Sequence, residues 1–355
     1  MDMLTIVTKI VEDGVRAPSG ENCQPWRFTW NGSRLSIFNV PEADTSLYNT
    51  LQRGSYMAHG ALLENISLSA KRYGYEARST LFPFGENEAR HVADVIFTPS
   101  SSEISPRYSA IVRRCTNRKD YSEEKLSSED IRALKDSVKG FADDCIVIDD
   151  KSKMSSFGYA LAVHEKVLFE NKSMHDFFYD HIIWNKKDEE KAGGFFIDTL
   201  EFLPHQLKAV KLLKHWGLLK IVNLLFRVST MISKDNGRKY AQGGGFFILT
   251  MKGDTLSDYI RLGIAMEKFW LEATVRSLAV HPCNGTLYLM RYMENGGEQA
   301  LSRRHAGMIR RAYKTITDLV REEKSSTVGF VFRVGKADEP TAVAKRLPPI
   351  IEVIS

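Results

Sequence analysis

Two short segments combine residue types that can bind a polar ligand. The first reads APSGENCQPWRF, residues 17–28, and places Ser19 and Asn22 between two prolines. Proline fixes φ and restricts the residue before it, so we expect a stiff loop that turns near Gly20 and is extended at Gln24. Such a loop can hold backbone N–H groups and short side chains against a flat polar ligand. It can equally be a simple helix-to-strand connection.

The second segment, RRCTNRKDY at residues 113–121, gathers cations and hydrogen-bonding side chains. Guanidinium groups match phosphate oxygens bidentately, so the cluster can bind a phosphate, although a solvated basic turn has the same composition. Further cations, Lys345 and Arg346, precede Leu-Pro-Pro near the C-terminus. In isolation that pair indicates nothing.

Composition limits the class of protein. The 355 residues are 43% hydrophobic, which suffices for one large domain or two smaller ones. The net charge of +5 arises from 49 basic and 44 acidic residues, a balance too even to indicate nucleic-acid binding. Four widely separated cysteines show no metal-ligand spacing, and the chain has neither an HExxH nor a GxSxG motif. We therefore expect reduced thiols, no metal and no serine nucleophile.

The N-terminal residues do not resemble a targeting segment. Residues 1–14 lack a basic n-region, and their apolar residues are periodic rather than continuous, so we expect no secretory signal. The chain also has no run of about 18 uninterrupted apolar residues, the length of a spanning helix. These observations favour a cytoplasmic location.

Hydrophobic periodicity predicts an alternation of helices and strands. An Asn-Gly turn at 31–32 predicts a hairpin between strands 26–30 and 35–40. A break after residue 97 suggests a domain boundary near residue 104. Further helices are expected at 56–73, from Ser127, at 152–170, 259–280 and about 299–323, and further strands at 91–97, 145–148, 246–251 and 328–334. Because 56–74 and 259–280 share a pattern, we infer two divergent copies of one α+β unit.

Residues 201–234 form an unusual stretch in which apolar residues alternate with cations. No acidic residue occurs between Glu201 and Asp235. A basic amphipathic helix of this kind can lie on an anionic membrane surface. Apolar helices beside a ligand site more often form a lid or pack against a partner.

Taken together, the segments resemble the FMN-binding nitroreductase-like family, in particular its long single-chain branch of the Acg type, in which two units are fused. APSGENCQPWRF resembles the family's Pro-Ser-x-x-Asn-x-Gln-Pro-Trp segment. IVRRCTNRKDYSEEKLSSEDI is similar to the arginine-rich opening of a nitroreductase unit, and AKRLPP after a GFVFRVG strand resembles the closing segment. The three motifs occur in the expected order and cover most of the chain.

The resemblance implies an α+β, nitroreductase-like fold. Two fused units, residues 1–104 and 105–355, would form an internal pseudodimer with mixed, mainly antiparallel sheets. A helical lid insert would occupy about residues 175–240. One FMN would lie between the halves, in a chain that is a monomer or a homodimer.

The same resemblance implies roles for individual residues. Arg114 and Arg346, and also Arg113, would bind the FMN phosphate. Ser19, Gly20 and Asn22 would touch the isoalloxazine ring. Thr116, Asn117 and Arg118 would contact the phosphate, ribityl chain or pyrimidine edge, with Arg118 near N1 and O2, and Asn284 and Gly285 would approach N5 through backbone amides.

The implied function is an FMN-dependent oxidoreductase that takes electrons from NAD(P)H or another donor and passes them to a small-molecule acceptor. Two alternatives remain: a flavin-sequestering protein with a closed lid, and a peripheral membrane or partner-binding protein that uses residues 205–234. One departure from the family pattern is Cys23, which stands where the family usually has serine. It is either a packing substitute or a thiol near the flavin.

Overall fold

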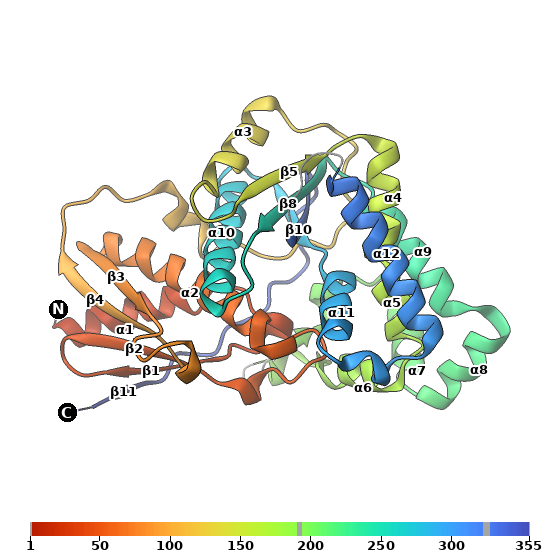
Figure 1. Cartoon of the computed structure of the whole chain (residues 1–355), viewed down its shortest axis with the longest axis horizontal. Coiled ribbons are helices and arrows are strands. Elements are labelled where there is room, and N and C mark those ends of the chain that lie inside the picture. The colour runs from red at the N-terminus through yellow and green to blue at the C-terminus, as the bar shows by residue number, and fades with distance from the viewer. Residues whose placement is uncertain (1, 190–193, 322–326, 355) are drawn as a thin grey trace.

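A computed structural model describes residues 2–189, 194–321 and 327–354, in which helices pack on two main sheets (Figure 1). Antiparallel pairing dominates both sheets. This confirms the predicted α+β class.

The first sheet has the strand order β11-β1-β2-β4-β3. The predicted hairpin is present, because the Asn31 side chain accepts hydrogen bonds from the backbone N–H groups of Ser33 and Arg34, and Gly32 has a φ of 88°. The last strand pairs in parallel with β1, so the C-terminal segment returns to the first sheet. The strands are β1 (Trp26–Trp30), β2 (Arg34–Asn39), β3 (Tyr75–Leu81), β4 (His91–Pro99) and β11 (Ile351–Val353).

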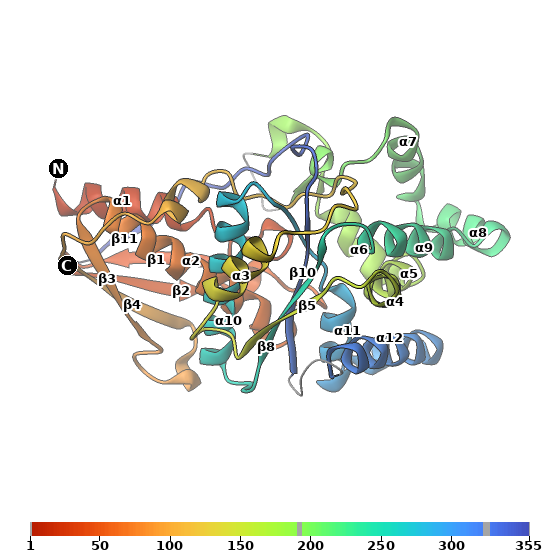
Figure 2. The ribbon, with the colours of Figure 1, turned by 90° about the horizontal axis from the view of Figure 1, so that it is seen from above.

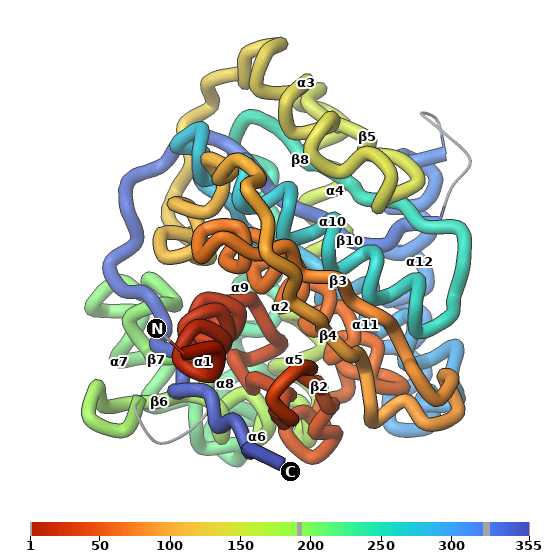
Figure 3. The backbone as a smooth tube through the Cα atoms, turned by 90° about the vertical axis from the view of Figure 1, so that its left-hand side faces the viewer, coloured from red at the N-terminus to blue at the C-terminus, as the bar shows by residue number. Residues whose placement is uncertain are grey.

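Two helices complete the first half. Helix α2 (Arg53–Arg72) packs on the first sheet and α1 (Met3–Gly14) packs beside α2, as Figure 3 shows from that end of the molecule. Apolar residues at helical spacing, such as Ile10 of α1 and Leu62 of α2, are completely buried in the same core as Phe28 of β1.

The second sheet has the order β5-β8-β10-β9 and is covered on both faces. Residues of β8 alternate between two cores: Phe247 packs with α10 (Leu256–Val275), whereas Phe246 packs with α4 (Lys151–Leu161) and α12 (Arg303–Arg321). Every residue of β8 is therefore buried. The strands are β5 (Asp144–Ile148), β8 (Gly245–Met251), β9 (Ala279–Pro282) and β10 (Thr327–Gly335), and α3 (Ser128–Ser137), capped by Ser127, precedes β5.

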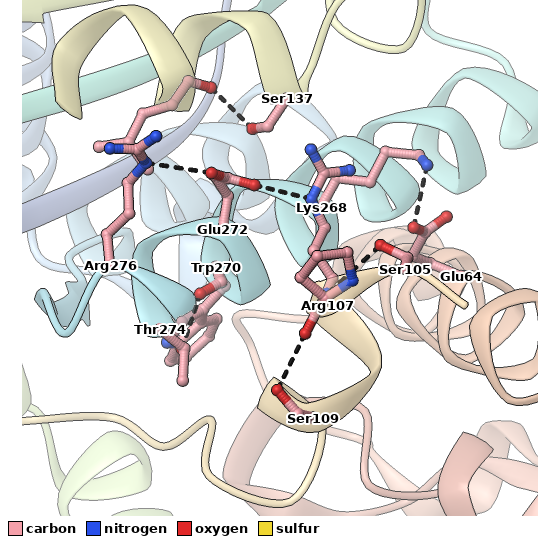
Figure 4. A network of polar contacts seen from close by, with 12 residues as sticks. Glu64, Ser105, Arg107, Ser109, Ser137, Lys268, Trp270, Glu272, Thr274 and Arg276 are labelled. Carbon is pink, nitrogen blue, oxygen red and sulfur yellow. Dashed lines mark hydrogen bonds and ion pairs between the residues drawn. The ribbon is translucent and has the colours of Figure 1, made fainter. Parts of the chain in front are cut away.

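Helix α2, which packs on the first sheet, crosses α10, which packs on the second sheet. A Cβ atom at Gly60 would lie 2.1 Å from the carbonyl oxygen of Ile260, and one at Gly263 would lie 2.0 Å from that of Met57. Each glycine thus allows the other helix to approach closely. Polar contacts of α10 strengthen the crossing (Figure 4), including the ion pair of Lys268 with Glu64 at 2.9 Å.

The remaining helices form a separate group beside the second sheet, and Figure 2 shows α7 and α8 far from the first sheet. No single described helix is long and apolar enough to cross a membrane; α8 and α9, bent by 80°, meet that test only as a pair. The group comprises α5 (Val163–Leu168), α6 (Lys172–Asp180), α7 (Pro204–Leu213), α8 (Trp216–Phe226), α9 (Val228–Tyr240) and α11 (Gly285–Glu294), with the short strands β6 (Ile182–Ile183) and β7 (Phe195–Phe196).

Three predicted helices differ in their bounds. The helix expected at 152–170 is broken at Ala162, because Thr286 and Ser233 donate hydroxyl hydrogen bonds to carbonyls at residues 160–162. The helix expected at 259–280 ends at Val275, since Ser277 has a φ of 55° and the chain then enters β9. The helix expected from 299 begins at Arg303, and residues 322–323 of that prediction lie outside the described residues.

Candidate functional site

The loop after α1 is held in an uncommon backbone conformation. Glu21, Asn22 and Gln24 have φ values of 45°, 60° and 52°, whereas Gly20 does not have positive φ. The prediction of an extended Gln24 is therefore wrong. The backbone N–H of Gln24 donates to the Ser19 hydroxyl at 3.0 Å, which closes the loop on itself. This local hydrogen bond outweighs the preference that the following proline imposes.

The loop is bound to the C-terminal segment. The Asn22 side chain donates to the carbonyl of Lys345 at 2.9 Å, and the Gln24 side chain accepts from the backbone N–H of Leu347 at 2.9 Å. Arg346 donates to the carbonyl of Ala17 at 3.3 Å. Two of the three sequence motifs, more than three hundred residues apart, thus form one surface.

The arginine-rich segment completes this surface from the other half. Arg114 is buried, forms an ion pair with Glu267 of α10 at 3.2 Å, and lies over the Trp270 ring at 4.6 Å. Arg114 also donates to the carbonyl of Arg16 at 2.6 Å, which joins it to the end of α1.

Arg114 and Arg346 line a small cavity of about 90 Å³. Burial, together with the charge of Arg114, lowers the pKa of Arg346 to about 9, so the Arg346 guanidinium group still carries its charge at neutral pH. Burial raises the pKa of Glu267 to about 7 against the opposing effect of Arg114. The guanidinium groups of Arg114 and Arg346 therefore lie near the buried carboxyl of Glu267, and a bound phosphate would balance their remaining positive charge. Asn22, Thr116 and Arg118 also line this cavity.

A larger cavity of about 360 Å³ lies next to the small one. Ser19, Thr116 and Arg118 line both cavities. Arg118 donates to the carbonyl of Thr199 at 3.0 Å and lies over the Phe195 ring, and burial lowers its pKa. The arrangement is a cation-lined end beside a chamber with mostly apolar and aromatic walls, including Met57, Met266, Trp270, Tyr288 and Phe330.

The residue types fit FMN. The guanidinium groups of the small cavity suit a phosphate, and the buried side-chain oxygen of Asn22 has no hydrogen-bond partner and can accept from a ribityl hydroxyl. The large chamber suits a flat ring, and Gly20 and the Asn284–Gly285 pair at the start of α11 also line it. The Asn284 side chain itself is used for structure, since it both donates to and accepts from the backbone of Val331.

Two predicted site residues line neither cavity. The Arg113 side chain is exposed and its Nε donates to the carbonyl of Ser109 at 3.4 Å. Asn117 is buried, but its side chain donates to the carbonyl of Asp338 at 2.8 Å and its backbone N–H donates to that of Val280. Asn117 therefore joins the arginine-rich segment to the chain at Val280 and Asp338. Arg113 lies on the surface.

Several polar residues of the large chamber escaped the sequence analysis. Glu21 lies inside the first motif, yet only the structure shows that it lines the chamber with Asp44. Burial, and then the charge of Asp44, raise the pKa of Glu21 to about 8. Across the chamber, Tyr240 at the end of α9 donates to Glu165 at 2.9 Å. The sequence carried no signal that these residues of distant segments converge.

Cys23 does not line either cavity. Burial and the nearby charges of Asp44 and Glu21 raise the pKa of its thiol well above the ordinary value. This is the property of a packed thiol rather than a reactive one. Within the described residues, no group of three or more His, Cys, Asp or Glu side chains could hold a metal ion.

The lid at about residues 175–240 stays a prediction. Phe178 of α6, Phe195 of β7, and Leu200 line the large chamber, as does Tyr240. Among the described residues, the basic helices α7 and α8 contribute no lining residue. Residues 190–193 of the predicted insert lie outside the described residues.

Comparison with known proteins gives three findings. No protein-family model matches the chain. The uncharacterized protein MT1398 of Mycobacterium tuberculosis is 22% identical over 338 residues, 95% of this chain and 46% of that protein. A second protein of that organism, which carries the provisional name NAD(P)H nitroreductase Acg, is 28% identical over 123 residues, 33% of this chain and 36% of that protein. The chain thus spans less than half the length of these relatives.

A solved structure, a nitroreductase with bound FMN from Bacteroides fragilis, aligns with a TM-score of 0.36 and 10% identity over 68% of this chain and 94% of that one. The name of the second relative agrees with the family that the three motifs resemble, and its similarity covers a third of this chain. The similarity to MT1398 extends over nearly the whole chain.

Proposed function

We propose that the chain is an FMN-dependent oxidoreductase that holds one FMN between its two halves. The observation that carries this proposal is the pair of adjoining cavities: one lined by Arg114 and Arg346, the other large enough for a flat ring, with Arg118 at their junction. The small, arginine-lined cavity suits a phosphate, and the larger, mostly apolar cavity suits an isoalloxazine ring. The provisional name of the relative Acg agrees with an oxidoreductase.

In this proposal each segment has a separate task. Arg114 and Arg346 bind the phosphate, while Ser19, Gly20 and Asn22 orient the ring and ribityl chain. Arg118 places a cation where negative charge builds on the reduced ring, which stabilises it electrostatically. When bound, the flavin supplies hydride or electron transfer, so no protein nucleophile is required. Arg113 and Asn117 remain predictions that rest on the family resemblance alone.

We further propose that the two halves are copies of one unit, with the division near residue 104. Both long helices carry a tyrosine four residues before the crossing glycine, Tyr56 before Gly60 and Tyr259 before Gly263. The chain would then be a monomer with an internal pseudodimer, or a homodimer of such chains. All four cysteines are free thiols, which favours the reducing cytoplasm as its location.

NAD(P)H is the proposed electron donor, and the acceptor would be a small molecule such as a nitro compound or a quinone. A second candidate function is flavin sequestration without turnover. The specific observation in its favour is that the apolar side chains of Phe178, Phe195 and Leu200 line the large chamber, where a closed lid of such residues would keep substrates out.

The visible spectrum of the purified protein tests both candidates. We expect flavin absorption bands, which should bleach within seconds when NADH or NADPH is added without oxygen if the protein is a reductase. Bands that persist until dithionite is added would favour sequestration. An apoprotein that fails to take up added FMN would contradict both.

A further inference from the structure

The corner between α8 and α9 exposes large apolar side chains to solvent. Leu224, Leu225 and Phe226 at the end of α8 are 83%, 66% and 65% exposed, and Met231 of α9 is 63% exposed. Single exposed apolar residues are common, but a cluster of adjacent ones usually marks an interaction surface. We refer to the corner formed by Lys220, Ile221, Leu224–Arg227, Met231 and Lys234 as the α8–α9 corner.

This exposure comes from a fixed arrangement of the two helices. The opposite side of α8 is attached to the protein body, because Leu219 is completely buried and the Asn223 side chain donates to the carbonyl of Phe169 at 2.8 Å. The same side chain accepts from the backbone N–H of Ser229 at 2.7 Å, across the 80° bend. With Leu219 and Asn223 facing inward, helical spacing directs Leu224 and Leu225 outward.

The segment that contains the α8–α9 corner is basic. Residues 202–234 contain six lysines and arginines and no aspartate or glutamate. All six are exposed, and none forms an ion pair with a described residue. They are Lys208, Lys211, Lys214, Lys220, Arg227 and Lys234.

We propose that the α8–α9 corner docks on an anionic lipid bilayer surface. Its apolar side chains would enter the boundary between headgroups and acyl chains while its cations contact lipid phosphates and carboxylates. A protein partner fits less well, since lysine is depleted in protein–protein interfaces. The proposal does not depend on the flavin. Because Tyr240 at the other end of α9 lines the large chamber, docking would place one helix between the bilayer and that chamber.

Vesicle flotation of the full chain at low ionic strength tests the proposal. We expect the protein to float with vesicles of equal parts phosphatidylserine and phosphatidylcholine and to remain unbound with phosphatidylcholine alone. Lys220→Glu with Arg227→Glu should weaken binding by at least about twentyfold, since each lost cation alone contributes about fivefold. Leu224→Ser with Phe226→Ser should weaken it by at least about tenfold at unchanged charge.

The matched control is Lys125→Glu with Arg132→Glu, which makes the same charge change on exposed residues at and before α3. This variant should float like the unmodified protein, and circular dichroism should show all variants folded. The proposal is wrong if the unmodified protein does not float, or if the control loses binding equally. It is also wrong if the serine variant only dissociates a dimer, measured by light scattering, which would assign the corner to a second copy of the chain.

Discussion

The two adjoining cavities differ in charge, although they share Ser19, Thr116 and Arg118. In the small cavity, Arg346 keeps its charge at neutral pH, and Arg114 forms an ion pair with the buried Glu267. In the large chamber, burial instead raises the pKa of carboxyls such as Glu21 toward neutrality. One region is therefore built to attract an anion, and the other to receive a flat group with little net charge. Ligand affinity and ligand selectivity should depend on different residues.

The largest expected effect is that of Arg114→Ala. This change removes the ion pair with Glu267 and the hydrogen bond to the Arg16 carbonyl, so we expect the free energy of unfolding to fall by about 1.5–3 kcal/mol and FMN binding to be lost. Denaturant unfolding and flavin fluorescence measure the two effects. Its neighbour provides the control, because Arg113→Ala removes an exposed arginine and should change neither quantity appreciably. Equal losses in both variants would contradict the assignment.

The variant Arg346→Ala should weaken FMN binding without a large change in the stability of the protein. Arg346 lines the small cavity and has no described carboxylate partner within ion-pair distance, so its loss should leave the fold intact. We expect FMN affinity to fall by about tenfold to a hundredfold, the effect of a charge-assisted hydrogen bond. Titration with FMN measures this, and Arg346→Lys should retain part of the affinity. If the alanine variant binds FMN with unchanged affinity, the phosphate does not bind at Arg346.

The variant Glu21→Gln tests whether a buried carboxyl of the large chamber makes the stability of the protein depend on pH. Because the pKa of Glu21 is raised from 4.5 to about 8 in the folded protein, folding favours its protonated form. This contribution to stability is present below pH 4.5 and is lost as pH rises through 8. At pH 8, the free energy of unfolding of the glutamine variant should therefore be about 2 kcal/mol larger than that of the original protein. Denaturant unfolding at several pH values measures this difference, which should disappear near pH 5. Glu103→Gln, an exposed control, should show no such trend.

The smallest expected effect concerns Cys23, which lies beside the chamber loop without lining it. Replacement by alanine should change the free energy of unfolding by less than about 1.5 kcal/mol and leave flavin reduction unchanged. Alkylation of the folded protein should be at least about tenfold slower at Cys23 than in the unfolded chain, because the raised pKa keeps the thiol protonated. Rapid alkylation would indicate a reactive thiol at the site.

Local signals in the sequence predicted much of the fold. The Asn31–Gly32 turn, the cap at Ser127 and the buried strand β8 all depend on residues close together in the chain. The prediction of one helix through Ala162 was wrong because the hydroxyl of Thr286, more than a hundred residues away in the sequence, donates hydrogen bonds to the carbonyls of Ala160 and Leu161. Periodicity contains no information about such distant partners.

The candidate site was predictable by residue type but not by position. Arg113 and Arg114 are chemically identical neighbours, and only the packing of Trp270 and Glu267 from α10 decides which one is buried. Glu21 was inside the recognised motif, yet its raised pKa depends on its burial and then on the charge of Asp44 from another segment. Site residues that act through the backbone or through burial therefore require the assembled structure.

The pairing of β11 with β1 also affects the order in which the protein folds. Ile351 pairs with Phe28, and the Gln24 side chain binds Leu347, so contacts of the site span almost the whole chain. Such distant pairing is slow to form because a long loop must close first. During synthesis on the ribosome, the small cavity is therefore complete only after residues 342–346 have emerged, and the ligand should bind after that point.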